Sequence, residues 1–134
     1  MPERRNISLV VEAGKVAEFR AATGLPRDDA ALFAPPTFPV VVEHAGAVFA
    51  DLLAERGVDL RRVLHGEERI DYPAGPLRVG EQLHGQMWIA GEESRERSEG
   101  SLTLTSVRME LRRADGSTAV TVDRVLVVLE DQPL

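Results

Sequence analysis

The segment Ala34-Pro35-Pro36-Thr37-Phe38-Pro39 divides this chain into two parts. Its adjacent prolines end any preceding helix, and Thr37 is a suitable N-cap residue. Pro39 is tolerated in a helix only within the first turn. We therefore expect a helix to begin at Phe38.

The residues after this segment carry the pattern of an amphipathic helix. Apolar side chains recur there at spacings of three, four and seven residues, at Phe38, Val41, Val42, Ala45, Val48, Phe49, Leu52 and Leu53. Gly57 then provides a left-handed stop. The sequence predicts one long helix over residues 38–57.

Length and composition limit the fold and the function. The 134 residues fit a single domain, residues 1–134, and the formal charge is −6. An acidic chain suits neither nucleic acid nor an anionic membrane as a partner. The chain has no cysteine, which excludes disulfides and thiolate chemistry and favours a cytoplasmic location. We expect no signal peptide and no membrane-spanning segment.

The other segments predict one short helix and an antiparallel sheet. The helix is expected at residues 16–22, before Gly24, and a loop at residues 25–36. Alternating or branched apolar stretches predict strands, at residues 7–11, 63–72, 83–89, 101–113 and 118–130. Residues 92–100 are expected to form a charged turn.

The last two strands carry a hairpin signal and a phase change. Asp115-Gly116 lies between alternating segments, and we expect Arg113 to pair with Thr118 across the turn. The apolar positions change phase once in each strand, which predicts bulges or strong coiling in one region, at Leu104 to Val107 and at Val122 to Val125. A sheet wrapped around a helix needs such a bend.

This order of elements is typical of the α+β class and resembles the hot-dog fold, a curved antiparallel sheet wrapped around one long central helix. The sequence itself resembles the MaoC-like dehydratases, specifically their N-terminal-type or accessory domains. Four stretches carry the resemblance, Phe19-Arg20-Ala21-Ala22-Thr23-Gly24, Ala34-Pro35-Pro36-Thr37-Phe38-Pro39, Leu64-His65-Gly66-Glu67-Glu68 and Pro76-Leu77-Arg78-Val79-Gly80-Glu81-Gln82-Leu83.

The resemblance implies a dimer of hot dogs, homomeric or heteromeric, in fatty acid or polyketide metabolism. Its substrate would be a (3R)-3-hydroxyacyl thioester of coenzyme A or acyl carrier protein, dehydrated reversibly without a cofactor. Catalytic members carry Asp and His in a D-x-N-P-x-H loop before the central helix, where an acid and a base must be positioned together.

That motif is absent from this chain. Residues 25–33 contain Asp28 and Asp29 but no His and no Asn-Pro pair. The non-catalytic subunits of heterodimeric (3R)-hydroxyacyl-carrier-protein dehydratases show the same loss. The resemblance therefore implies an acyl-binding subunit of a dehydratase or hydratase whose partner supplies the Asp/His dyad.

Several residues are candidates for a site. For an active thioesterase or atypical dehydratase homodimer, the catalytic candidates are Glu43, His44 and Asp28. For an acyl-binding wall, the candidates are residues of the loop before the helix, its small-residue face and the third strand, namely Phe33, Phe38, Ala47, Trp88 and His84. A further alternative is a binding or structural module without turnover.

The remaining polar residues favour structural roles. His65 would share an exposed strand face with Glu67, Arg69 and Asp71. Three histidines in separate elements make no metal-binding pattern, so no metal is expected. The pairs Arg4-Arg5 and Arg61-Arg62 suit solvated surface, or a phosphate of coenzyme A or an acidic carrier protein.

Overall fold

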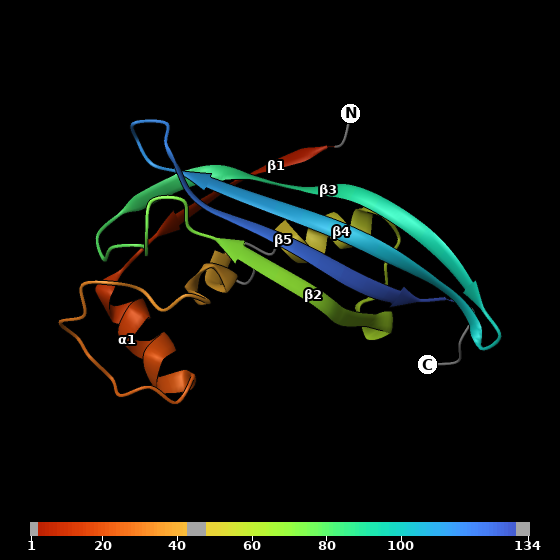
Figure 1. The fold of residues 1–134 in the computed structure, drawn as a ribbon, viewed down its shortest axis with the longest axis horizontal. Helices are drawn as coiled ribbons and strands as arrows, with labels where there is room; N and C mark the ends of the chain where they lie inside the picture. The colour runs from red at the N-terminus through yellow and green to blue at the C-terminus, as the bar shows by residue number, and fades with distance from the viewer. Residues whose placement is uncertain (1–2, 43–47, 131–134) are drawn as a thin grey trace.

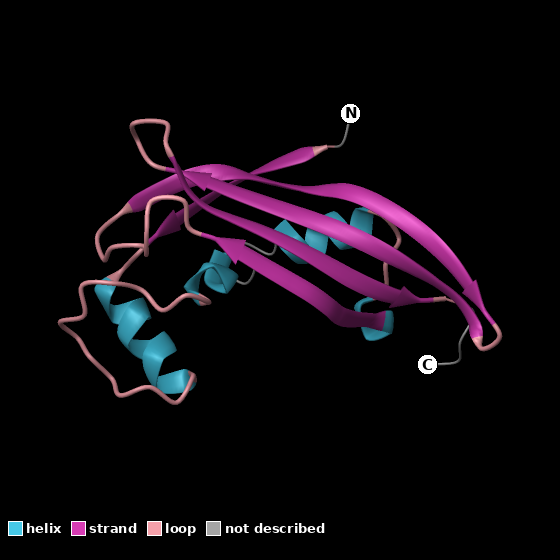
Figure 2. Cartoon of the chain, viewed as in Figure 1, coloured by secondary structure: helices cyan, strands magenta, loops and turns pink. Residues whose placement is uncertain are grey.

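The computed structural model describes residues 3–42 and 48–130. Figures 1 and 2 show a long arched sheet with the helical segments on its concave side and α1 at one end. In chain order the elements are β1 (Arg4–Val10), α1 (Ala13–Ala22), the 3-10 helix η1 (Phe38–Val40), α3 (Val48–Glu55), the 3-10 helix η2 (Leu60–Arg62), β2 (Val63–Asp71), β3 (Gln82–Arg97), β4 (Gly100–Arg112) and β5 (Thr118–Leu129).

The sheet has five strands in the order β1-β3-β4-β5-β2, and each neighbouring pair is antiparallel. The predicted α+β class, the short helix and the strand segments are confirmed. β1 and β2 are the edge strands, so each has a ladder partner on one side only. Side chains alternate between an inner face towards α3 and an outer face.

The expected helix over residues 38–57 is described in two parts. It starts as the 3-10 helix η1, with Pro39 in its first turn as predicted. Thr37 occupies the N-cap position but its side chain makes no capping hydrogen bond, so its predicted role as a side-chain cap is wrong. α3 ends at Glu55, and Gly57 follows two residues later with a φ of +71°, as expected for a left-handed stop. Residues 43–47 lie outside the described part of the chain.

The core lies between the inner face of the sheet and the helical segments. Phe38, Leu53 and Leu83 are fully buried there. The ring of Phe38 also meets Phe19 of α1 edge-on, with centroids 5.6 Å apart. Such aromatic contacts and buried aliphatic side chains fix α1 and η1 against the sheet.

β3 is much longer than its apolar pattern predicts. It continues to Arg97, and only Ser98 and Glu99 form the turn to β4, so the expectation of a charged turn over residues 92–100 is wrong. The charged segment extends because β4 satisfies its backbone hydrogen bonds, from Glu92 opposite Thr105 to Arg97 opposite Gly100. Its exposed side chains remain in water.

The sheet bends along one row of residues, although not by the expected means. The β4–β5 register is continuous from Leu102 to Leu111, so the bulges expected within that stretch are absent. Instead, the pairing register shifts by one residue in β3, between Ile89 and Gly91, and in β2, between His65 and Glu67. Both slips lie on a single transverse row, Gly91, Ser106, Val125 and Glu67.

The phase change in the sequence has a different cause from a bulge. Beyond the bent row, the inner positions of β4 are Thr103 and Thr105, both buried, whereas Leu104 points to the outer face. The apolar residues thus exchange faces while the backbone register stays regular. The phase change in the sequence lies at the row where the register shifts, but the shifts belong to the neighbouring strands β3 and β2.

The β4–β5 hairpin at Asp115-Gly116 is confirmed, with a small correction to its register. Thr118 pairs with Arg112 rather than Arg113, because the ladder shifts by one residue next to Leu111. The amide of Arg113 instead donates to the Ser117 carbonyl at 2.9 Å.

Glu81 links the start of β3 to this hairpin. Its carboxylate accepts from Arg113 Nε at 2.6 Å and from the amide of Arg78 at 2.9 Å. Burial alone would raise the pKa of Glu81, but the hydrogen bonds and charges of these two arginines outweigh it and hold the pKa below its ordinary value of 4.5. The fold therefore favours the ionised carboxylate.

Glu81→Gln is expected to lower the free energy of unfolding by about 1.5 to 3 kcal/mol at pH 7, as for a lost charged hydrogen bond. The contribution of Glu81 is fully present above its unfolded pKa near 4.5 and disappears as pH falls through the lower folded pKa. Urea unfolding at pH 7 and at acid pH should show the two proteins converging on acidification. Glu18→Gln, in an exposed pair with Lys15, is the control and should change little.

Gly85→Ala is expected to destabilise the fold by about 1 to 3 kcal/mol or more. A β-carbon at Gly85 would overlap the backbone carbonyl of Glu110, where β3 and β4 approach closely. Gly91→Ala in the same strand is the matched control, because nothing lies within 4 Å of its added β-carbon. Equal unfolding midpoints for the two variants would contradict this account.

Candidate functional site

Asp28 lies in the loop between α1 and η1. Its Oδ1 accepts a hydrogen bond from the amide of Ala30 at 3.0 Å, and the neighbouring Asp29 pairs with Arg27 at 3.0 Å. No hydrogen bond or ion pair joins Asp28 to His65 or His84 in the described part of the chain. Its carboxylate is thus used in a local turn of its own loop.

The two phenylalanines at the ends of this region differ in environment. Phe38 is fully buried in the core. Phe33 is 42% exposed, pairs through an isolated bridge with Arg78, and has that guanidinium 5.5 Å from its ring centroid. Of these two side chains, Phe33 is therefore the one that presents an aromatic surface to solvent.

Trp88 and His84 lie on the outer face of β3, since their neighbours Leu83 and Met87 face the core. Trp88 is largely buried beneath Arg4, whose guanidinium is 4.0 Å from the ring centroid. His84 is exposed. Trp88 and His84 therefore lie on the opposite side of the sheet from the core.

The other candidates from the sequence lie outside the described residues. These are Glu43, His44 and Ala47.

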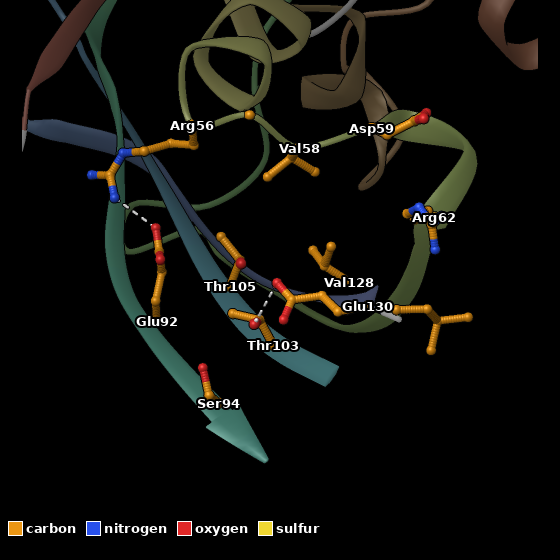
Figure 3. A pocket seen from close by; sticks show the side chains of 12 residues that line it. Arg56, Val58, Asp59, Arg62, Glu92, Ser94, Thr103, Thr105, Val128 and Glu130 are labelled. Carbon is orange, nitrogen blue, oxygen red and sulfur yellow. Dashed lines mark hydrogen bonds and ion pairs between the residues drawn. The ribbon is translucent and has the colours of Figure 1, made fainter. Parts of the chain in front are cut away.

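A polar cleft of about 350 Å³ lies beyond the end of α3. Figure 3 shows Thr103, Thr105 and Glu130 on its sheet side, with Val58 opposite. Its polar groups already bind one another: Arg56 pairs with Glu92 at 2.6 Å, and Thr103 donates to Glu130 at 3.1 Å. This polar cleft is a poor match for an apolar ligand.

A second cleft, of about 480 Å³, lies between the helical segments and the inner faces of β2 and β5. We call it the β2 cleft. It sits at the margin of the sheet because β2 is an edge strand. Apolar walls surround a small polar group of side chains, and the lining consists of Val40, Phe49, Val63, His65, Glu68, Arg124 and Leu126. Mostly apolar clefts with a few convergent polar groups are typical of small-molecule sites.

An ion pair forms part of the lining of the β2 cleft. Arg124 of β5 is only 5% exposed and binds Glu68, its cross-strand neighbour on β2. The guanidinium also lies 5.4 Å from the ring centroid of Phe49 on α3. Because a buried charge needs a partner, this pair fixes β2, β5 and α3 relative to one another.

His65 extends this cluster towards solvent. Its Nε2 is 3.9 Å from Glu68 Oε2, and about half of the imidazole is exposed. The prediction that His65 shares a face with Glu67, Arg69 and Asp71 is wrong, because the bulge at Gly66 moves His65 to the inner face.

Tyr72 connects the end of β2 to the start of η1. Its hydroxyl donates to the carbonyl of Pro36. Burial, together with the charge of Glu68, raises the pKa of Tyr72 to about 12, so the phenol stays neutral and can donate. This bond holds the proline segment beside the cleft.

The cleft suits binding better than proton transfer. The Glu68 carboxylate is already bound by the Arg124 guanidinium, so it is poorly placed to take a proton from a ligand. Within residues 3–42 and 48–130, no group of three His, Asp or Glu side chains could hold a metal ion. No helix of the described chain is long and apolar enough to span a membrane.

Neither Arg124 nor the inward position of His65 is predicted from the sequence. A signal existed for His65, since a glycine inside a strand pattern often marks a bulge. Arg124 occupies an inner position of β5, and the inner positions on either side of it hold Val122 and Leu126. Its partner lies 56 residues earlier in the chain, a separation that strand periodicity does not reveal.

Residues 3–122 match the family model described as "FAS1-like, dehydratase domain region". The UPF0336 protein Lxx02810 of Leifsonia xyli subsp. xyli is 32% identical over 128 residues, which are 94% of this chain and 74% of that protein. A UPF0336 protein of Thermobifida fusca is 35% identical over 102 residues, 76% of this chain and 64% of that protein.

Solved structures show the same fold. A 3R-hydroxyacyl-ACP dehydratase complex of Mycobacterium tuberculosis, HadBC, contains a chain with a TM-score of 0.65 and 23% identity, over 95% of this chain and 94% of that one. The ChsH1-ChsH2 complex of the same organism gives a TM-score of 0.69 at 13% identity, over 98% and 85%. The predicted family resemblance and a hot-dog-like fold are therefore confirmed, whereas one continuous central helix over residues 38–57 stays a prediction, because residues 43–47 lie outside the described chain.

Glu68→Ala is expected to destabilise the protein by about 2 to 4 kcal/mol, because it removes a carboxylate that binds the buried Arg124 guanidinium. The loss is somewhat below that of a fully buried pair, since the Glu68 side chain is 27% exposed. Replacing both residues by leucine should restore stability to within about 1 kcal/mol. Urea unfolding measures both, with Asp71→Ala, in an exposed pair with Arg69, as a near-neutral control.

Proposed function

Because the chain belongs to the family of FAS1-like dehydratase domain regions, we propose that it is the acyl-binding subunit of a 3-hydroxyacyl-thioester dehydratase or hydratase. The thioester carrier is coenzyme A or acyl carrier protein. A partner hot-dog subunit, of the same family, supplies the catalytic Asp and His. This chain contributes a surface that holds the acyl group.

The observation that carries the proposal is the β2 cleft beside an unpaired strand edge. Its walls include Val40, Phe49 and Val63, which suit an alkyl or acyl group. The edge of β2 offers backbone groups for pairing with a second sheet. A partner docked there would face the cleft and could share its ligand.

The environment of Asp28 supports a non-catalytic role. Dehydration of a 3-hydroxyacyl thioester removes a proton from C2 and expels the hydroxyl from C3, which requires a positioned base and acid. Asp28 instead caps the amide of Ala30 in an exposed loop. HadBC, the 3R-hydroxyacyl-ACP dehydratase complex of Mycobacterium tuberculosis that contains a chain of similar fold, supports an assignment of that chemistry to a partner.

The purified chain alone is expected not to hydrate a trans-2-enoyl thioester. Hydration is measured as the loss of the absorbance of the conjugated thioester. Mixed with a MaoC-like subunit that carries the D-x-N-P-x-H motif, the chain should form a complex and raise the rate at least about tenfold over that subunit alone. Turnover by the chain alone would overturn the accessory role.

Val63→Glu should lower kcat/KM of the complex by about tenfold or more, because it places a charge against the acyl group in the cleft. Leu64→Glu is the matched control on the outer face of the same strand, where Leu64 is 55% exposed. Size-exclusion chromatography of both complexes separates lost binding of substrate from lost association. Equal kcat/KM for intact complexes of both variants would exclude the β2 cleft as the acyl site.

A further inference from the structure

We propose that the Glu68–Arg124 pair makes the β2 cleft selective against long saturated acyl chains. The cleft would accept short acyl groups, or longer ones that carry a hydroxyl or keto oxygen beyond C3. This inference rests on the proposed function, because it concerns what the same cleft binds.

The pair occupies the inner part of the cleft. Exposure of the side chains falls from 51% at His65 to 27% at Glu68 and 6% at Arg124. A ligand that fills the cleft therefore contacts these polar groups as well as the apolar side chains of Val63 and Phe49. A site for long alkyl chains would present apolar side chains in place of the polar ones.

A long alkyl chain would cover these groups without replacing their water. Each buried methylene strengthens binding by about fourfold. Each polar group that loses water and gains no hydrogen bond weakens it by roughly five- to 150-fold. Covering His65 and Glu68 thus offsets the gain from several methylenes, and affinity should stop rising with chain length.

An oxygen on the acyl chain changes this balance. His65 and Arg124 carry N–H donors, and Glu68 carries acceptor oxygens, so a hydroxyl or keto group has partners within one cluster. The ion pair itself fixes the positions of these groups through the β2–β5 ladder. The cleft therefore recognises a polar substituent and not merely a short chain.

The test compares affinities for butanoyl-CoA, decanoyl-CoA and 5-hydroxydecanoyl-CoA by isothermal titration calorimetry. For the wild-type chain, decanoyl-CoA should bind within about fivefold of butanoyl-CoA, and the 5-hydroxy thioester should bind more tightly than both. In the double variant Glu68→Leu/Arg124→Leu, decanoyl-CoA should bind at least about 50-fold more tightly than butanoyl-CoA.

The matched control is Arg108→Leu/Asp123→Leu. This pair, 2.7 Å apart, also crosses neighbouring strands but lies on the outer face, so its loss should leave the preferences unchanged. Two results would overturn this inference and leave the proposed function intact. One is a wild-type chain that binds decanoyl-CoA 50-fold more tightly than butanoyl-CoA. The other is a Glu68/Arg124 double variant whose ratio of these two affinities equals that of the wild-type chain. Failure of every thioester to bind either protein overturns both.

Discussion

The antiparallel ladder that β4 forms with β3 and β5 is the constraint on which the other features depend. Its register runs without a break from Leu102 to Leu111 on the β5 side. A fixed register determines which side chains face α3, because alternate residues point to opposite faces. The slips in β3 and β2 lie on one row through Ser106 and Val125, so the sheet bends there and keeps a continuous centre.

The contrast between a regular central ladder and shifted neighbouring strands explains which features the sequence could predict. Strand periodicity and the Asp115-Gly116 turn identify strands and hairpin, because both signals are local. The length of β3 was missed because residues 92–97 are charged and exposed, and only their backbone bonds to β4 keep them in the sheet. The phase change of β4 indicated the bent row, but polarity alone could not distinguish a bulge from an exchange of faces such as that at Thr105 and Leu104.

In the candidate site, too, local sequence signals predict the backbone but not which side chains come together. The proline segment before η1 was placed correctly, and it lies beside the β2 cleft through the bond from Tyr72 to Pro36. The cluster inside the cleft depends on one glycine: the bulge at Gly66 shifts His65 inward and leaves Glu68 opposite Arg124. A one-residue slip reverses every side chain beyond it, so a regular strand would have predicted the wrong face.

Two kinds of site are therefore separated in this hot-dog domain. In the loop that corresponds to the dyad loop of catalytic members, Asp28 caps the turn at Ala30 and Asp29 pairs with Arg27. The β2 cleft keeps a charged pair within apolar walls, which costs stability unless each charge retains its partner. Leucines at both positions are expected to hold the sheet together to within about 1 kcal/mol, so stability alone does not account for a pair of charges at this place in the cleft.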